Sequence, residues 1–253
     1  MKSYLLGIDI GTSACKVAVF DRNGKVLAAA SGDYPVYYPQ EGWAEQNPEE
    51  WWDAVCRASK ETIQKADIKP DEIAGIGIDG QSWSAIAIDK EGKVLTNTPI
   101  WMDTRAQSIC DRLNQEIGAE KIFDVAGNSL QPSYSTAKIL WYKENLPEVY
   151  AKIDKILQSN SYIAYKLTGV ISQDVSQGYG LHCFDMKKAC WDEEMCELLG
   201  IPMEFLPEIC DCDHVIGSVT AKAAAKCGLS EGTPVVAGGL DAACGTLGAG
   251  VIH

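Results

Sequence analysis

The fold is decided by one short segment, which reads Gly7-Ile8-Asp9-Ile10-Gly11-Thr12-Ser13-Ala14-Cys15-Lys16. It predicts a strand that ends in the carboxylate of Asp9, a tight turn at Gly11, and a strand that returns antiparallel to the first. Such a turn directs backbone N–H groups and the hydroxyls of Thr12 and Ser13 towards one point, as a phosphoryl group with its metal ion requires. The alternative, in which Asp9 and Gly11 only shape a hairpin, has equal weight on these residues alone.

Strands and helices both follow this segment. Asn47 is suited to cap a helix and Pro48 to open it, so we expect a helix over 48–65. A buried strand is expected to lead into a small-residue helix from Ala242 onward. Strands mixed with helices favour an α/β layer fold over a simple βαβ repeat. The predicted strands are 4–9, 16–20, 26–30, 73–79, 84–88 and 233–237, and helical character is expected over 104–141 and 162–167.

Composition argues against several classes of partner. The chain has 253 residues, 46% of them hydrophobic, which is enough for a substantial core. Its 22 Lys and Arg against 35 Asp and Glu give a net charge of -13, which would repel nucleic acid and anionic membranes. The sequence shows no leader and no apolar run of about 20 residues, so we expect a soluble, cytoplasmic protein.

Cysteine usage indicates a reducing compartment. Cys210 and Cys212, followed by Asp213 and His214, have the wrong spacing for a zinc knuckle, and no second ligand pair follows, so a plain loop is expected. The other eight lie in apolar segments, which indicates reduced, buried thiols. These eight are Cys15, Cys56, Cys110, Cys183, Cys190, Cys196, Cys227 and Cys244.

Several motifs resemble those of a known family. The D-x-G-T-S pattern that starts at Asp9 resembles the first phosphate motif of the actin-like ATPases and sugar kinases. A second segment resembles the signature of the FGGY carbohydrate kinases. It reads Pro132-Ser133-Tyr134-Ser135-Thr136-Ala137-Lys138-Ile139-Leu140-Trp141-Tyr142-Lys143-Glu144-Asn145. Tyr142 departs from that signature, which usually has an aliphatic residue there. Segments 42–48 and 100–105 are similar to the family's W-x-E-Q-x-P and W-x-D-x-R segments, and the similarity runs from Leu5 to Gly250.

The last matching segment is Gly238-Gly239-Leu240-Asp241, which is similar to the family's G-G-x-D segment. The resemblance implies that Asp241 is the catalytic base. A carboxylate at a strand-to-helix turn is able to accept a hydroxyl proton as the alcohol attacks phosphorus, and the helix N-terminus keeps it ionised. Without the surrounding resemblance, a simple helix cap would be the preferred interpretation of Asp241.

The same resemblance implies roles for two further groups of residues. Asp9 would position Mg²⁺ or its waters, and the phosphoryl group of ATP would meet Gly11, Thr12, Ser13 and Lys16. Polyols are bound by planar hydrogen-bonding groups against an aromatic face, which Trp residues beside Gln and Asp supply. The sugar-binding candidates are Gln81, Ser82, Trp83, Trp101 and Asp103.

The implied activity is ATP-dependent phosphorylation of a sugar hydroxyl. The W-x-E-Q-x-P and W-x-D-x-R segments lean towards the xylulokinase branch and a ketopentose such as D-xylulose. Members of that branch usually carry Met-His-Gly where this chain has Ser82-Trp83-Ser84, so ribulose, a polyol or glycerol are alternatives. Two rival functions are a truncated, non-catalytic sugar-binding protein and an actin-like chaperone, the second of which does not account for residues 132–145.

The resemblance also implies a domain plan. Residues 1–236 are expected to form an actin-like, ribonuclease H-like sugar-binding domain, and residues 237–253 to open a nucleotide-binding domain whose remainder is absent. The partner expected for this chain is therefore the missing C-terminal lobe, and a homodimer is left open. Because glycine-rich nucleotide loops are missing, the chain alone is expected to have negligible kinase activity.

Overall fold

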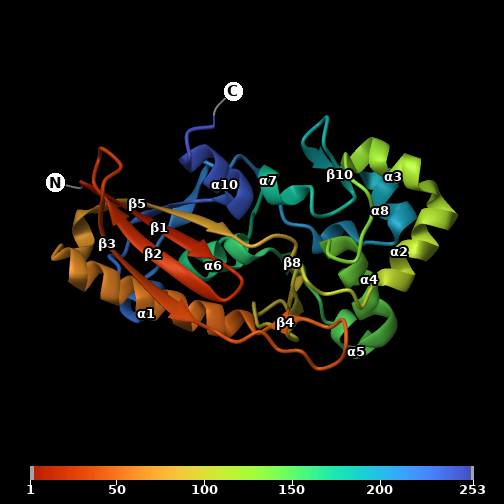
Figure 1. The fold of residues 1–253 in the computed structure, drawn as a ribbon, viewed down its shortest axis with the longest axis horizontal. Helices are drawn as coiled ribbons and strands as arrows, with labels where there is room; N and C mark the ends of the chain where they lie inside the picture. Colours follow the sequence, from red (N-terminus) through yellow and green to blue (C-terminus); the bar gives the residue numbers. More distant parts are fainter. Residues whose placement is uncertain (1–2, 252–253) are drawn as a thin grey trace.

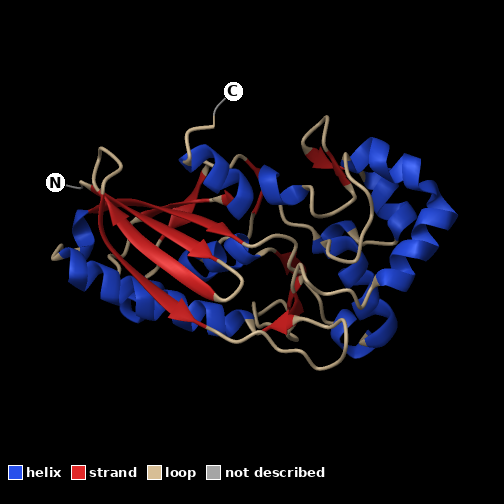
Figure 2. Ribbon diagram, viewed as in Figure 1, coloured by secondary structure: helices blue, strands red, loops and turns tan. Residues whose placement is uncertain are grey.

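The computed structural model describes residues 3–251 and is elongated, with a sheet at one end and a group of helices at the other (Figures 1 and 2). In the described residues, no helix is long and apolar enough to cross a membrane.

The largest sheet joins an antiparallel meander to parallel strands. Its members are β1 (Tyr4–Ile10), β2 (Ala14–Phe20), β3 (Val26–Asp33), β5 (Ile73–Gly80), β13 (Val215–Ser218), β14 (Pro234–Val236) and β15 (Gly239–Leu240). The strand order is β13-β14-β5-β1-β2-β3, and β15 also pairs with β5. Strand β1 pairs antiparallel with β2 and parallel with β5, while β14 and β15 both run parallel to β5. The carboxyl ends of β1, β5 and β15 therefore share one edge of the sheet.

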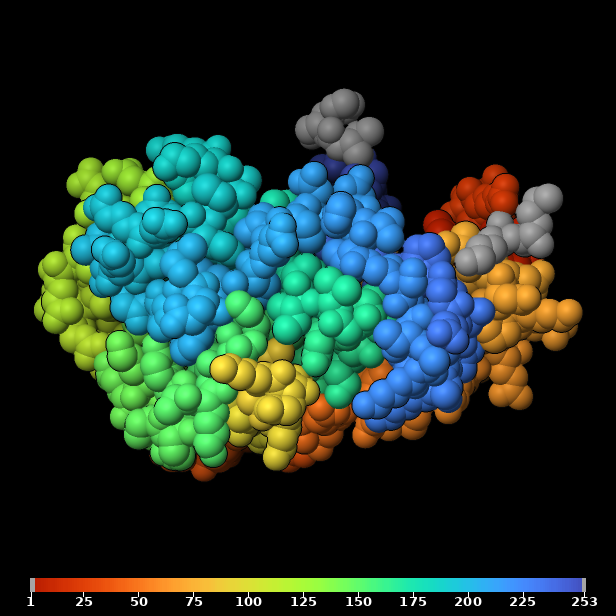
Figure 3. Space-filling model, turned by 180° about the vertical axis from the view of Figure 1, so that it is seen from behind, coloured from red at the N-terminus to blue at the C-terminus, as the bar shows by residue number. Residues whose placement is uncertain are grey.

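Three helices cover one face of this sheet. Helix α1 (Pro48–Ala66) lies along β2 and β3, and α6 (Ser159–Thr168) lies against β5. Helix α9 (Ala221–Cys227) contacts both α1 and α6, so that segments far apart in the sequence lie side by side, as the view from behind shows (Figure 3). Alternate strand residues such as Leu6 and Ile8 are buried against these helices, and this apolar contact stabilises the sheet.

The start and end of α1 follow from local chemistry. The side chain of Asn47 accepts a hydrogen bond from the backbone N–H of Glu49 at 3.0 Å, and Pro48 occupies the first turn. The helix ends at Asp67, whose φ of 53° lies in the left-handed region. The predicted helix is confirmed, with one more residue than expected.

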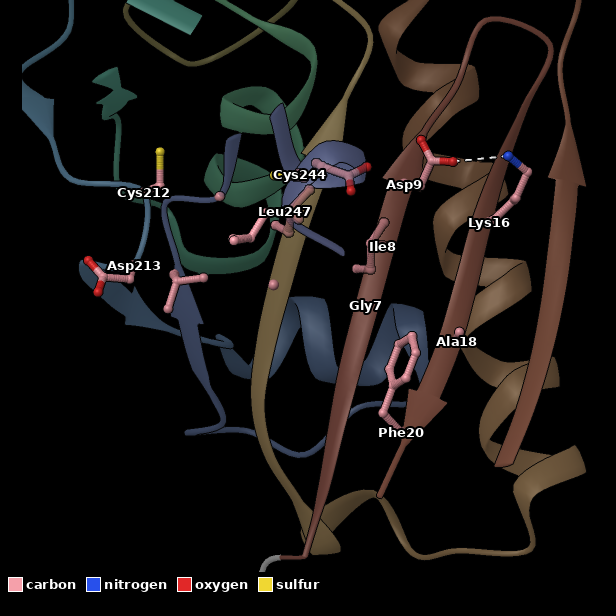
Figure 4. A pocket seen from close by; sticks show the side chains of 15 residues that line it. Gly7, Ile8, Asp9, Lys16, Ala18, Phe20, Cys212, Asp213, Cys244 and Leu247 are labelled. Carbon is pink, nitrogen blue, oxygen red and sulfur yellow. Dashed lines mark hydrogen bonds and ion pairs between the residues drawn. The ribbon is translucent and has the colours of Figure 1, made fainter. Parts of the chain in front are cut away.

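The opposite face of the sheet carries α10 (Asp241–Gly248) and an open groove of about 540 Å³ beside it (Figure 4). Small strand residues, Gly7, Ala18 and Gly77, form the floor of the groove, and Phe20 and Leu247 line it. Leu247 is 64% exposed, so this face retains uncovered apolar surface.

The second part of the molecule is mainly helical and has its own apolar core. Its elements begin with α2 (Gln107–Leu113), a π-helical turn over Asn114–Gly118 and α3 (Ala119–Ala126). They continue with α4 (Ser135–Asn145), α5 (Pro147–Tyr150), β10 (Phe184–Asp185), β11 (Cys190–Trp191) and α8 (Glu193–Leu199). The expected helical character is confirmed over 107–126 and 135–141, but 127–134 is not helical, because α3 ends at Gly127 with a φ of 67°.

Short elements connect the two parts. Strand β6 (Ile86–Ile88) pairs with β8 (Lys155–Leu157), and β4 (Glu45–Gln46) pairs with β7 (Thr98–Pro99). Strand β9 (Gln173–Asp174) precedes α7 (Val175–Gly178) and pairs with β12 (Ile209–Cys210). The 3₁₀ turns are Pro70–Glu72 and Met203–Phe205. The predicted strand over 84–88 begins later than expected, at Ile86.

The cysteines are all free thiols, and six of the eight expected to be buried are buried. The expectation is wrong for Cys190, which is exposed because it lies in the short surface hairpin of β10 and β11. Cys244 is half-buried beside the groove.

Replacing Gly32 with Ala is expected to destabilise the fold by about 1–3 kcal/mol, since an added Cβ would lie 2.9 Å from the carbonyl oxygen of Ala54 in α1. Urea unfolding measures this change. The control is Ser31→Ala, an exposed position on the same strand, which should leave the unfolding free energy nearly unchanged. Equal stability of the two variants would show that α1 does not pack this closely on β3.

Candidate functional site

Three carboxylates meet where the parallel strands end. The pairing of β1 with β5 places Asp9 opposite Asp79, and the pairing of β15 with β5 places Gly239 opposite Asp79. Asp241 follows β15 directly as the first residue of α10. Asp9 and Asp79 line the groove on the α10 face (Figure 4). The acidic cluster of Asp9, Asp79 and Asp241 is thus built by strand register.

Asp79 is the member of the acidic cluster that the sequence analysis missed. Burial, then the charge of Asp9 and a hydrogen bond with it, and then the charge of Asp241, raise the pKa of Asp79 to about 7. Its Oδ1 atom is buried and has no hydrogen-bond partner in the described structure. The sequence does contain a signal for it, because Gly-Ile-Asp occurs at 7–9 and again at 77–79.

Lys16 and Asp241 flank this pair. Lys16 Nζ lies 3.1 Å from Asp9 Oδ2, and Figure 4 shows the side chain directed at that carboxylate. The Lys16 side chain is 70% exposed, so the ion pair is screened by solvent. Asp241 Oδ1 accepts a hydrogen bond from the N–H of Ala242 at 2.7 Å, and burial raises the pKa of Asp241. One carboxylate oxygen of Asp241 remains available.

The turn after β1 is held by side chains from distant segments. Tyr34 donates a hydrogen bond to the carbonyl of Gly11 at 2.6 Å, and Ser13 accepts one through its carbonyl from the N–H of Tyr34 at 3.3 Å. The indole N–H of Trp101 donates to Thr12 Oγ1 at 3.0 Å. The structure therefore brings together Thr12, predicted to meet phosphate, and Trp101, predicted to meet sugar.

Gln81 belongs to a buried chain of amides rather than to an open surface. Its Nε2 donates to Gln46 Oε1 at 2.8 Å, and Gln46 Nε2 donates to the carbonyl of Thr12 at 2.8 Å. The Gln81 side chain is 1% exposed, and its Oε1 has no partner in the described residues. Its neighbour Ser82 is half-buried.

Asp103 is fully buried in an ion-pair network. Both its oxygens contact Arg105, and Oδ2 also accepts from the N–H of Ala44 at 2.7 Å. Arg105 also pairs with Glu45 at 2.8 Å and lies over the ring of Trp43. In this arrangement Asp103 holds the 100–105 segment in place and presents no free oxygen to a sugar, so direct sugar contact by Asp103 would require a rearrangement.

Trp83 forms an aromatic wall with two residues that the sequence analysis did not select as ligands. Its ring stacks on Tyr134 with centroids 4.0 Å apart and an interplanar angle of 22°. Tyr179 meets Trp83 edge-on at 5.8 Å. Tyr134 was visible within the run 132–145, but Tyr179 lies outside every motif. Tyr179 directly follows α7, and Ser176 of α7 accepts a hydrogen bond from the N–H of Leu240 at 2.9 Å, which connects the wall to the strand that leads into Asp241.

Comparisons with known proteins identify the family of this chain. The model of the FGGY family of carbohydrate kinases, N-terminal domain, matches residues 4–248. Xylulose kinase of Bacillus subtilis (strain 168) is 34% identical over 98% of this chain and 50% of that kinase. Glycerol kinase of Thermococcus gammatolerans is 33% identical over 86% of this chain and 45% of that kinase.

Solved structures of carbohydrate kinases share the fold of this chain. Xylulose kinase from Rhodospirillum rubrum matches with a TM-score of 0.94 and 28% identity, over 99% of this chain and 51% of that one. Gluconate kinase from Lactobacillus acidophilus matches with a TM-score of 0.88 and 32% identity, over 94% of this chain and 48% of that one. The predicted α/β fold of actin-like, ribonuclease H-like type is confirmed. The chain spans about half the length of these relatives.

The raised pKa of Asp79 predicts a pH dependence of stability. Its folded-state pKa of about 7 lies above the ordinary value of 3.8 for an aspartate, so the unfolding free energy should fall as pH rises from about 4 to 7. Asp79→Asn should remove this loss, so that between pH 5 and pH 8 the variant gains on the order of 1 kcal/mol of unfolding free energy relative to wild type. The gain is small because partial exposure screens the charges. Urea unfolding at both pH values measures it, with the exposed Asp124→Asn as control. An unchanged pH dependence in Asp79→Asn would contradict the proximity of the carboxylates.

Arg105→Met is expected to destabilise the chain by about 3–5 kcal/mol, because it leaves the buried Asp103 without a counter-charge. The matched control is Arg112→Met, which breaks an exposed pair with Glu144 and should cost under about 1 kcal/mol. Thermal and urea unfolding compare the two. Similar losses in both variants would show that the Asp103 network contributes no more than a surface pair.

Proposed function

The chain belongs to the FGGY family of carbohydrate kinases, and we propose that it is the sugar-binding half of an enzyme that transfers the γ-phosphoryl group of ATP to a sugar hydroxyl. The observation that carries this proposal is the acidic cluster at the ends of β1, β5 and β15, next to the Gly11–Ser13 turn and connected to the aromatic wall through α7. A proton acceptor, phosphate-binding groups and a polyol-binding surface are then adjacent.

In this proposal Asp241 is the general base. Its Oδ1 is held by the N–H of Ala242, which leaves Oδ2 to accept the proton of the sugar hydroxyl as that oxygen attacks phosphorus. The N-terminus of α10 favours the ionised form, which opposes the effect of burial. The sugar hydroxyl becomes the bridging oxygen of the phosphate ester, and ADP leaves.

The donor set of the site fits Mg²⁺. Magnesium prefers oxygen ligands and commonly combines one or two carboxylates with waters and substrate phosphates. Asp9 would hold the ion or its waters, and the unpartnered Oδ1 of Asp79 offers a second oxygen. Bound Mg²⁺ would neutralise charge that develops on the transferred phosphoryl group. Lys16 and the hydroxyls of Thr12 and Ser13 would orient that group.

The sugar would lie against the aromatic wall and Trp101. Trp101 is 43% exposed, so its ring presents a face to solvent while its N–H holds Thr12. The half-buried Ser82 would supply a polar contact. Gln81 would contact the sugar through its unpartnered Oε1 only after a rearrangement that exposes this buried atom. Asp103 would act by fixing the Trp101 loop. We propose a ketopentose such as D-xylulose as substrate, with ribulose, a polyol, glycerol and gluconate as the alternatives that titration must separate.

The rest of the kinase would complete the site. The groove beside α10 leaves apolar strand surface open, and relatives have about as much chain again as this one. We therefore propose that a second, nucleotide-binding lobe packs near this face and closes over the acidic cluster, excluding water during transfer. A domain boundary between residues 236 and 237 stays a prediction, and β15 and α10, which follow it, both contact β5. The cytoplasmic location also stays a prediction, and a homodimer stays open.

Asp241→Asn tests the proposed base in a protein that joins this chain to the second half of a xylulose kinase relative. The variant should lower kcat by about 10²–10⁴-fold, since proton acceptance is lost. The control is Asp213→Asn, which changes a carboxylate lining the groove but outside the acidic cluster and should leave kcat unchanged. A coupled ADP-release assay measures turnover, and wild-type turnover by Asp241→Asn would exclude Asp241 as the base.

Residues 1–253 alone should show negligible kinase activity, because in this proposal the second lobe supplies the nucleotide-binding loops. The same ADP-release assay with ATP and the candidate sugars checks this. Sustained turnover by the purified chain would mean that nucleotide binds within residues 1–253, and the proposed division of labour between lobes would be wrong.

A further inference from the structure

Lys138 in α4 is a fully buried lysine, and no carboxylate of residues 3–251 forms an ion pair with it. Its Nζ donates to two backbone carbonyls, that of Trp83 at 2.7 Å and that of Ser133 at 2.6 Å. Burial lowers the pKa of Lys138 to about 7, while Asp103 favours the charge and Arg105 opposes it. Both protonation states have enough N–H groups for the two carbonyls. Burying an amine costs free energy, and the two hydrogen bonds to the carbonyls offset that cost.

The two carbonyls bracket the aromatic wall. One belongs to Trp83 itself, and the other belongs to the residue directly before Tyr134, whose ring stacks on Trp83. A single side chain thus ties together the two backbones that present the stacked rings. These segments are about 50 residues apart in the sequence, and the wall depends on their alignment.

Trp83 also has an unfavourable backbone conformation. Its φ of 61° lies in the left-handed region, which bulky residues rarely adopt. The Trp83 ring is closely packed, since a Cβ added at Gly180 would lie 2.6 Å from Trp83 Cδ1. A strained residue of this kind persists only where its surroundings hold it. The hydrogen bond from Lys138 to the Trp83 carbonyl is such a restraint.

We propose that Lys138 is a positioning residue that holds Trp83 in its left-handed conformation, stacked on Tyr134, and thereby gives the aromatic wall the shape that accepts a polyol. The proposal rests on the proposed function for the identity of the ligand, but the alignment of Trp83 by Lys138 is a property of the chain alone. The bound molecule would place the C–H face of a sugar or sugar alcohol on the wall and direct a hydroxyl towards Asp241.

The test uses residues 1–253 and the variants Lys138→Met, Trp83→Leu and Lys143→Met. Subtracting the near-ultraviolet circular dichroism spectrum of Trp83→Leu from that of wild type gives the signal of the stacked indole. Lys138→Met should lose the same signal while its far-ultraviolet spectrum stays native, and its Kd for D-xylulose, or for whichever candidate sugar wild type binds, should rise at least tenfold. Lys143→Met, which removes an exposed lysine from the same helix, should change neither.

A folded Lys138→Met that keeps the Trp83 signal would overturn the proposal, even if sugar affinity fell. If Lys138→Met does not fold, Lys138→Gln takes its place, because the amide nitrogen of Gln lies one bond closer to the backbone than Nζ and does not reach both carbonyls. Retention of the full Trp83 signal in Lys138→Gln would equally overturn the proposal. If wild type binds no sugar, the proposed function fails, and the dichroism comparison still decides the role of Lys138.

Discussion

The parallel pairing of β1 and β15 with β5 is the constraint on which the rest of the molecule depends. It brings the carboxyl ends of three strands to one edge, so that the residues that follow them must share a small volume. The N–H of Gln81 donates to the carbonyl of Ile10 at 2.8 Å, which continues the pairing into the loops themselves. The Gly11–Ser13 turn, the loop after Gly80 and the N-terminus of α10 are therefore positioned by backbone hydrogen bonds.

This arrangement concentrates negative charge at a site where it costs stability. Asp9, Asp79 and Asp241 repel one another, and the ion pair of Lys16 with Asp9 is exposed and weak. A fold selected for stability alone would not keep three carboxylates at adjoining strand ends. The cost is consistent with a site that gains binding energy when a metal ion and phosphate are present. The buried amides of Gln46 and Gln81 and the Asp103–Arg105 network tie the loops around this cluster together through hydrogen bonds and ion pairs.

Local chemistry made much of the fold predictable. The hairpin at Gly11, the cap at Asn47 and the turn into Asp241 each depend on residues within a few positions, and all were expected. The loop at 127–134 was not, because helical periodicity continues on both sides of a stop made by Gly127. Cys190 looked like a core thiol, since composition alone does not distinguish a surface hairpin from a buried strand.

The site was less predictable, because its contacts join distant segments. Asp79 becomes part of the acidic cluster only through register with β1, and Tyr179 reaches Trp83 from about 100 residues away. Asp103 was selected as a sugar ligand from its motif, yet the structure satisfies both its oxygens within the protein. A motif identifies which residues matter, but the partners that occupy a side chain depend on tertiary contacts.

The account is tested most directly by calorimetric titration of residues 1–253 with D-xylulose, D-ribulose, L-ribulose, xylitol, glycerol and D-gluconate, in parallel with Trp101→Ala. We predict selective binding of one of these compounds and its loss in the variant, whose exposed indole forms part of the proposed pocket. A well-folded chain that binds none of them, or whose binding is unchanged in Trp101→Ala, would contradict the assignment of this half of the molecule as the sugar-binding half.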